Sequence, residues 1–159
     1  MVSKSFLPLE AFKTIVQNTP LVSIDLVVRN THSEVLLGKR LSQPAKGFWF
    51  VPGGRILKDE LFKQAFRRLV FEELGVHHEI DDSHFLGSFE HHYPDVSSGS
   101  DFSIHYIVLA FELNLDLNLD ELPEEQHNDY KCFSVAELLE SDTVHEHTKW
   151  YFQQEKYLK

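Results

Sequence analysis

The chain is 159 residues long, 42% of these residues are hydrophobic, and 13 of them are phenylalanine. This length fits one domain spanning 1–159, and the apolar content is enough for a core that needs no disulfide. The formal net charge of −10 argues against nonspecific nucleic-acid binding, which needs a basic surface.

Cys132 is the single cysteine, which excludes a disulfide framework and a cysteine-rich zinc site and fits a reducing compartment. Residues 1–20 hold no basic segment followed by a long apolar run, and no apolar span reaches 18 residues. We therefore expect a soluble, cytoplasmic protein with no membrane partner and no nucleic-acid partner.

The first third of the chain predicts one helix and three strands. Residues 8–17 place apolar side chains at helical spacing and end before a proline, which predicts a helix. Residues 21–29 and 34–40 are rich in Val, Ile and Leu and flank a turn-forming Asn-Thr-His-Ser, which predicts an antiparallel pair. After a loop at 41–47, residues 48–52 predict a short aromatic strand.

The last half predicts two long strands, an irregular acidic region and a helical end. The segments are a turn at 77–82, a strand at 84–93, a mobile Ser/Gly-rich loop at 94–101, a strand at 102–113, mostly loop at 114–129, a short strand at 130–133, a helix at 135–141 capped by Ser134, and an amphipathic helix at 144–158. Strands in an antiparallel meander with these helices predict an α+β fold.

The most informative stretch is 53–76, GGRILKDELFKQAFRRLVFEELGV. A glycine pair precedes a run with apolar residues at helical spacing, and the run ends in two glutamates before Gly75, which is typical of a helix C-terminus. A helix that bears carboxylates and faces a glycine loop suits a hard metal ion that carries a phosphorylated ligand.

This stretch resembles the Nudix box, G-x5-E-x7-R-E-U-x-E-E-x-G-U, in which U is a bulky apolar residue. The residues in register are Gly54, Glu60, Arg68, Val70, Glu72, Glu73, Gly75 and Val76. Six fixed letters match by chance about once in 10⁷ starting points at average residue usage. The resemblance implies the Nudix fold, an α/β/α sandwich around a mixed β-sheet. Leu69 departs from the pattern, because the box has a glutamate directly after its arginine.

The two adjacent glutamates of the box are about 100° apart around the helix, so only one points straight into a site. Glu72 lies four residues after Arg68, at the spacing of an ion pair; this pair is either a surface interaction or one that orients the acidic turn. In the resembled family the last glutamate, here Glu73, ligates Mg2+. The leucine at 69 removes a carboxylate one turn earlier, which implies fewer metal ions and no obvious base on the helix.

Residues outside the box complete the candidate site. Gln126 has an amide oxygen that suits a hard cation, and His127 accepts a proton when neutral, although a loop histidine is often only solvent-exposed. Arg40 and Arg55 flank the glycine pair and are able to clamp phosphate oxygens, unless they are simply solvated. Asp25 is out of pattern in an apolar strand, and a surface position and a ligand contact are equally open.

His91, Tyr93 and Tyr106 fall on or beside the later strands, where aromatic packing and contact with a sugar or base are both open. The segments TPLVSID, LLGKR, GFWFVPGGR, SDFSIHY and EEQHNDY, together with the leucine in the box, resemble the GDP-mannose mannosyl hydrolase subgroup of the family. The likeness runs from about Thr19 to the end of the chain.

This resemblance implies a Mg2+-dependent enzyme that transfers the sugar of GDP-mannose to water, and a homodimer. Its implied metal ligands are Gly53, Glu73 and Gln126, the implied general base is His127, the groups on the departing GDP are Arg40, Arg55 and Tyr106, and the sugar side is lined by Asp25 and His91. Mannose and glucose are not distinguished, because both sugars share the anomeric leaving group.

Three alternatives compete with this interpretation. A Nudix diphosphohydrolase would cut a P–O bond of a nucleoside diphosphate derivative, but the leucine in the box argues against it. A catalytically silent sensor of nucleotide sugars is disfavoured by the intact candidate ligands and base. An RNA-decapping enzyme is disfavoured by the net charge of −10.

Overall fold

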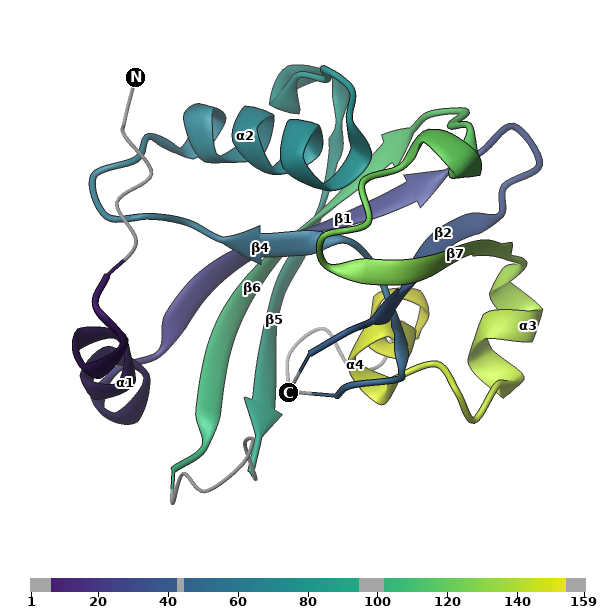
Figure 1. Ribbon diagram of the computed structural model, residues 1–159. Coiled ribbons are helices and arrows are strands. Elements are labelled where there is room, and N and C mark those ends of the chain that lie inside the picture. The colour runs from purple at the N-terminus through teal and green to yellow at the C-terminus, as the bar shows by residue number, and fades with distance from the viewer. Residues whose placement is uncertain (1–6, 43–44, 95–101, 154–159) are drawn as a thin grey trace.

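The computed structural model describes residues 7–42, 45–94 and 102–153 (Figure 1). The strands are β1 (Leu21–Arg29), β2 (Val35–Arg40), β3 (Trp49–Phe50), β4 (Gly53–Arg55), β5 (His84–Tyr93), β6 (Ile104–Asn114) and β7 (His127–Phe133). The helices are α1 (Leu9–Asn18), α2 (Phe62–Leu74), α3 (Val135–Glu140) and α4 (Glu146–Lys149), with 3-10 turns η1 (Ile80–Asp82), η2 (Leu119–Glu121) and η3 (Trp150–Phe152).

All seven strands belong to one sheet of order β3-β2-β1-β6-β5, with β4 paired to β1 and β7 paired to β2. Strands β1 and β6 are parallel, from Leu21 opposite Tyr106 to Arg29 opposite Asn114. The predicted antiparallel meander is therefore wrong at this pair, although the β1–β2 and β5–β6 pairs are antiparallel as expected. A parallel pair needs a long crossover, and the segment that contains α2 supplies it. The result is a mixed sheet.

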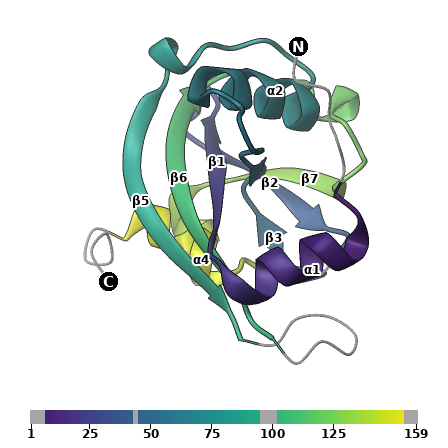
Figure 2. The ribbon, with the colours of Figure 1, turned by 90° about the vertical axis from the view of Figure 1, so that its left-hand side faces the viewer.

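The sheet is buried on both faces, and the two faces are visible in β1. Ile24 and Leu26 pack in the cluster that includes Phe66 of α2, whereas Val27 packs in the cluster that includes Leu138 of α3. Successive side chains of a strand point to opposite faces, so the apolar run in β1 serves both layers. Figures 1 and 2 show α2 on one side of the sheet and α4 on the other. The predicted α+β class and the sandwich are confirmed.

Helix α2 confirms the predicted helix in the box. Its first turn is capped by the Gln64 side chain, which accepts a hydrogen bond from the Leu61 backbone N–H at 3.1 Å. Gly75 ends the helix with φ of 72°, a left-handed conformation that glycine adopts without strain. Within the described ranges, none of the helices has the length and apolar character needed to cross a bilayer.

Three local predictions are corrected by the structure. The strand predicted at 48–52 is shortened to β3 at Trp49–Phe50, and the glycine pair lies in a separate strand, β4, which pairs with β1. The loop at 114–129 contains η2 and the start of β7, since His127 pairs with Arg40 across the sheet. The helix predicted at 144–158 is the short α4 followed by η3, and the Gln153 N–H after η3 donates to the Trp150 carbonyl. The part of this prediction beyond residue 153 lies outside the described residues, as does most of the loop predicted at 94–101.

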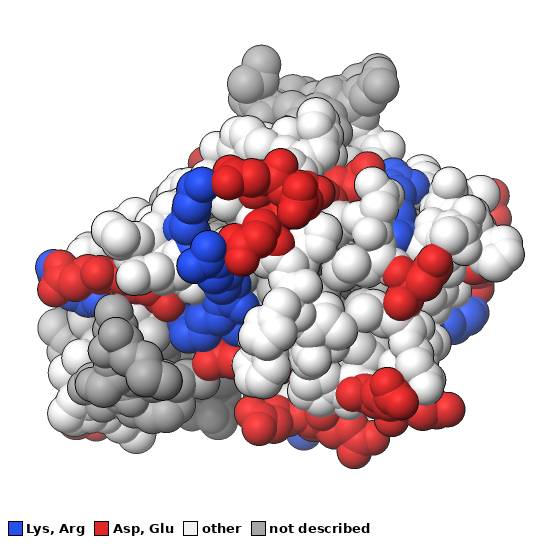
Figure 3. All heavy atoms as spheres, turned by 90° about the horizontal axis from the view of Figure 1, so that it is seen from above, with Lys and Arg blue, Asp and Glu red and all other residues white. Residues whose placement is uncertain are grey.

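Charged side chains on the α2 side of the molecule occur largely in opposite-sign pairs. Lys63 lies 2.7 Å from Asp81, and Arg67 lies 2.8 Å from Glu79. Figure 3 shows the basic side chains of this face beside acidic ones. Exposed pairs of this kind stabilise the fold by at most about 1 kcal/mol each.

Candidate active site

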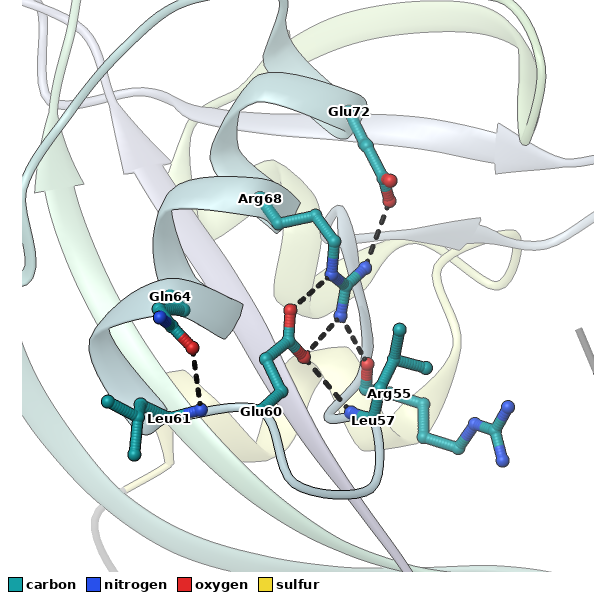
Figure 4. A network of polar contacts seen from close by, with 7 residues as sticks. All are labelled: Arg55, Leu57, Glu60, Leu61, Gln64, Arg68 and Glu72. Atoms are coloured by element: carbon teal, nitrogen blue, oxygen red, sulfur yellow. Dashed lines mark hydrogen bonds and ion pairs between the residues drawn. The ribbon is translucent and has the colours of Figure 1, made fainter. Parts of the chain in front are cut away.

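Arg68 joins helix α2 to the segment that leads into it. Its guanidinium donates to both carboxylate oxygens of Glu60, at 2.6 and 2.9 Å, to Glu72 at 3.0 Å and to the Arg55 carbonyl at 2.9 Å (Figure 4). Glu60 also accepts from the Leu57 N–H at 3.0 Å, and its side chain is only 4% exposed. Burial alone would raise the pKa of Glu60, but the bonds from Arg68 hold it below its usual value.

This network fixes the backbone of Arg55 while the side chain of Arg55 points away from it (Figure 4). The expected Arg68–Glu72 pair is present, and Arg68 also binds the buried Glu60, a partner that the sequence did not predict. Two of the box's glutamates, Glu60 and Glu72, are thereby committed to Arg68.

Leu69 explains the second glycine of the pair. The leucine is 2% exposed and belongs to the apolar cluster under α2. A Cβ on Gly54 would lie 2.6 Å from the Cδ2 of Leu69, so the close approach of strand and helix requires glycine there. The box position that departs from the pattern therefore contributes to the core and offers no charge.

A cavity of about 240 Å³ opens beside the glycine pair, at the junction of β1, β2, β4, β5, β6 and β7. It is lined by Ser23, Asp25, Arg40, Phe50, Val51, Gly53, Gly54, Arg55, His91, Tyr93, Tyr106, Val108, Gln126 and His127. Eight of the nine site residues predicted from the sequence are in this list. The ninth, Glu73, lies behind His127, with 3.9 Å between its Oε2 and the histidine Nδ1.

Glu73 and His127 are both almost fully buried, at 3% and 5% exposure. Burial, with Glu72 nearby, raises the pKa of Glu73 to about 7. Burial, with Arg40 nearby, lowers the pKa of His127 to about 4. Both groups are therefore shifted toward their neutral forms. His127 is not an exposed loop histidine, because its ring packs against Gly38, where a Cβ would lie 2.5 Å from the ring.

Asp25 faces the cavity and not the outer surface, so the surface interpretation is wrong. Its carboxylate accepts a hydrogen bond from the Tyr151 hydroxyl, and burial raises its pKa to about 6 although Tyr151 and Arg40 oppose that shift. His91 lies 3.3 Å from the same hydroxyl and stacks on His147 with ring centroids 4.3 Å apart. Burial lowers the pKa of His91 to about 3, which keeps the imidazole neutral.

The cationic and phenolic groups of the cavity are held by aromatic neighbours. The guanidinium of Arg40 lies 5.3 Å from the ring centroid of Phe50, and that of Arg55 lies 4.8 Å from that of Phe12. Burial raises the pKa of Tyr106 above its usual value, so its hydroxyl keeps its proton and donates. The cavity thus combines two guanidinium cations with the Asp25 carboxyl and several neutral hydrogen-bonding groups, which suits an anionic ligand with a polar uncharged part.

A family-wide profile of the NUDIX domain matches residues 19–154. The chain belongs to the Nudix family. A curated relative, the low-salt glycan biosynthesis protein Agl8 of Haloferax volcanii, is 43% identical over 127 residues, which cover 80% of this chain and 79% of that protein.

Solved structures agree on the Nudix fold. The MutT protein of Methanosarcina mazei superposes with a TM-score of 0.70 at 22% identity, covering 86% of this chain and 94% of that one. The Nudix domain of Shewanella oneidensis NrtR, in a complex with ADP-ribose, superposes with a TM-score of 0.64 at 18% identity, covering 96% and 100%. At these identities the likeness concerns the fold alone.

Two residues of the cavity network in this Nudix chain are not predicted from the sequence. Tyr151 joins Asp25 to His91, and His147 supports the His91 ring. Both come from the segment 144–152, whose histidines and aromatic residues were assigned to an amphipathic helix. The one feature of the sequence that indicates such a role is the high density of histidines and aromatic residues in this segment.

Proposed function

We propose that this Nudix protein is a GDP-sugar hydrolase that converts GDP-α-D-mannose and water to GDP and mannose, with GDP-glucose as a second possible substrate. The chain resembles the GDP-mannose mannosyl hydrolase subgroup in the residues quoted above. Its relative in Haloferax volcanii is named for glycan biosynthesis, in which activated sugars are the usual donors.

The observation that carries the proposal is that the box offers the cavity a single carboxylate. Glu60 and Glu72 are bound by Arg68, and Leu69 fills the core where another glutamate is expected. Only Glu73 is left next to the cavity. A water nucleophile that attacks phosphorus among anionic oxygens is best served by several metal ions, and one carboxylate on the helix supports fewer. Attack at carbon needs only a leaving group whose charge is neutralised.

The donors present fit Mg2+. The Gly53 carbonyl, the Glu73 carboxylate and the Gln126 amide would hold it, and all three are the oxygen ligands that this ion prefers. Glu73 supports this assignment, because a buried carboxyl with a raised pKa has no Lys or Arg within 4.0 Å among the described residues. When bound, Mg2+ supplies positive charge to the diphosphate oxygens of the substrate.

In this proposal His127 accepts the proton of the attacking water. Its Nδ1 is buried and has no hydrogen-bond partner among the described residues, and its lowered pKa keeps it neutral at pH 7. As the water oxygen bonds to the anomeric carbon, the bond from that carbon to the diphosphate oxygen breaks and its electrons leave with GDP. A single displacement inverts the centre, so β-mannose is the first product.

Arg40, Arg55 and Tyr106 stabilise the departing GDP. The two guanidiniums bind phosphate oxygens, and the protonated phenol donates to the oxygen that leaves. His127 and Arg40 are cross-strand neighbours on β7 and β2, which places base and cation side by side. Asp25 and His91 then form the sugar side, where a carboxylate and a neutral imidazole bind hydroxyl groups.

Product analysis tests this function. Incubation with GDP-mannose and Mg2+ is expected to give GDP and free mannose, separated by ion-exchange chromatography. GMP and mannose 1-phosphate would show the diphosphohydrolase instead, and binding without turnover would show a sensor. Parallel assays with GDP-glucose and ADP-ribose would define which sugar and which base the enzyme accepts. The homodimer implied by the resemblance stays a prediction for analytical ultracentrifugation.

A further inference from the structure

The β5–β6 hairpin carries a second group of chemically active side chains on the face away from the cavity. His91 and Tyr106 point into the cavity. Because side chains alternate along a strand, their neighbours Glu90, His92 and His105 project from the opposite face. His92 and His105 are directly opposite each other in the antiparallel register.

The ligand atoms of this cluster converge. A carboxylate oxygen of Glu90 and one ring nitrogen from each of His92 and His105 all lie within 4.8 Å of one another. Oε1 of Glu90 is 2.5 Å from Nε2 of His92 and 3.3 Å from Nε2 of His105. The two imidazole rings are stacked, with centroids 4.2 Å apart and an interplanar angle of 19°.

One of these nitrogens is buried and poorly satisfied. Nε2 of His105 has no well-formed hydrogen bond within the described part of the chain, and its nearest acceptor is Oε1 of Glu90 at 3.3 Å. A buried unpaired nitrogen is costly, and a bound cation next to Glu90 would satisfy it. The strand pairing around the cluster runs from His84 to Tyr93 on β5, so the three donors are held on a rigid frame.

We propose that Glu90, His92 and His105 form a binding site for a divalent cation of the zinc class, with water in the remaining positions. Two imidazole nitrogens and one carboxylate are a ligand set that Zn2+ accepts with an open position. Imidazole selects Zn2+, Cu2+ or Ni2+ over Mg2+, whereas the cavity donors are all oxygen. The site is independent of the proposed function, because none of its residues lines the cavity.

Calorimetric titration with Zn2+ in the presence of excess Mg2+ tests the site. We expect one equivalent of Zn2+ to bind, and the affinity to fall by about 100-fold or more in His92→Gln and in His105→Gln, because even indirect partners of metal ligands are worth about 10–100-fold. His84→Gln is the matched control, since His84 is an exposed histidine on the same strand. It should bind as the wild type does.

Thermal unfolding provides a second readout that does not need activity. Zn2+ should raise the Tm of the wild type and of Glu73→Gln, because an ion that binds only the folded state stabilises it by mass action. It should leave the Tm of His92→Gln unchanged. Wild-type Zn2+ affinity in the His92 and His105 variants, or no Zn2+ binding by the wild type, would overturn the proposal and leave the cluster as a surface ion pair. Loss of Zn2+ binding in Glu73→Gln would also overturn it, because the ion would then bind in the cavity.

Discussion

Helix α2 contributes to two groups of buried titratable side chains that differ in how they are satisfied. At the first, Arg68 donates four hydrogen bonds and keeps Glu60 ionised, with a pKa below its usual value. At the second, Glu73 and His127 are as deeply buried but 3.9 Å apart, and both are shifted toward their neutral forms.

The difference separates structure from function within one motif. A fully paired buried network stabilises the fold and has nothing left to offer a ligand. A buried carboxyl and imidazole without strong partners are costly for the fold, and such groups cluster at functional sites. The account therefore predicts that mutations in the second group abolish chemistry, whereas mutations in the first lower stability.

The largest loss of activity is expected for Glu73→Gln. Removing the charged metal ligand should reduce kcat/KM by about 10³-fold or more, because metal stabilisation of developing charge is worth several kcal/mol. Thermal stability should be retained, since the substitution removes a desolvated carboxyl. Glu72→Gln is the control, and it should change kcat/KM by less than about 3-fold. Equal losses in the two variants would mean that the wrong face of the helix has been assigned to the metal.

His127→Gln should lower kcat by about 10²–10⁴-fold, the usual contribution of a general base. Mg2+ affinity, measured by calorimetry, should change little. His127 is neutral above its pKa of about 4, so at saturating Mg2+ the wild-type kcat should fall as pH drops toward that value. The variant should lack this acidic limb of the pH–rate profile. Near-full activity with the limb intact would exclude His127 as the base.

A second acidic limb should respond to the metal. Glu73 is ionised above a pKa of about 7, so at limiting Mg2+ the kcat/KM should fall as pH drops below 7. Rising Mg2+ should move this limb to lower pH, because metal and proton compete for the same carboxylate. A limb that stays fixed at all Mg2+ concentrations would separate Glu73 from the metal.

Leu69→Glu tests whether the box can be returned to the common pattern. Because Leu69 is 2% exposed in the core, the new carboxylate should cost about 3 kcal/mol or more in the free energy of unfolding. The products should stay GDP and mannose, as metal number and substrate pose would both have to change. Efficient GMP formation by this variant would show that residue 69 alone selects the bond that breaks.

Arg68→Lys is expected to affect stability more than activity. Lysine keeps the charge but loses the planar fork that binds both oxygens of Glu60. We expect a loss of about 2 kcal/mol in the free energy of unfolding and a change in kcat below about 10-fold. Arg67→Lys, on an exposed pair with Glu79, should be within about 0.5 kcal/mol of the wild type. A large loss of kcat in Arg68→Lys with unchanged stability would show that the Arg68 group serves catalysis and not the stability of the fold.

Local sequence signals predicted most elements but only part of their pairing. The helix of the box was predicted from apolar spacing and Gly75, and it is observed at Phe62–Leu74. The parallel β1–β6 pair was not predicted from local patterns, because alternation within a strand does not specify its neighbour. The C-terminal segment was predicted as one long helix, and this prediction was wrong. Tyr151 bonds to Asp25, a residue far away in sequence, and a local pattern does not show such a contact.

The sequence predicted a set of residues that the structure brings together around one cavity, but it did not predict how deeply they are buried. The resemblance identified eight residues that line one cavity, but the burial of His127 was unexpected because its strand pairing with Arg40 is a long-range contact. Burial and Arg40 lower the pKa of His127, and both effects arise from contacts that the local sequence does not specify. Tyr151 joins the site through its contact with Asp25, which forms only when the chain folds.

The most direct test of the central claim is hydrolysis of GDP-mannose with Mg2+ in 18O-water, followed by mass spectrometry of both products. The account predicts that the label enters mannose and is absent from GDP, because water attacks the anomeric carbon. Early NMR spectra should show β-mannose before mutarotation. Label in GMP or in mannose 1-phosphate would place the attack at phosphorus and contradict the account.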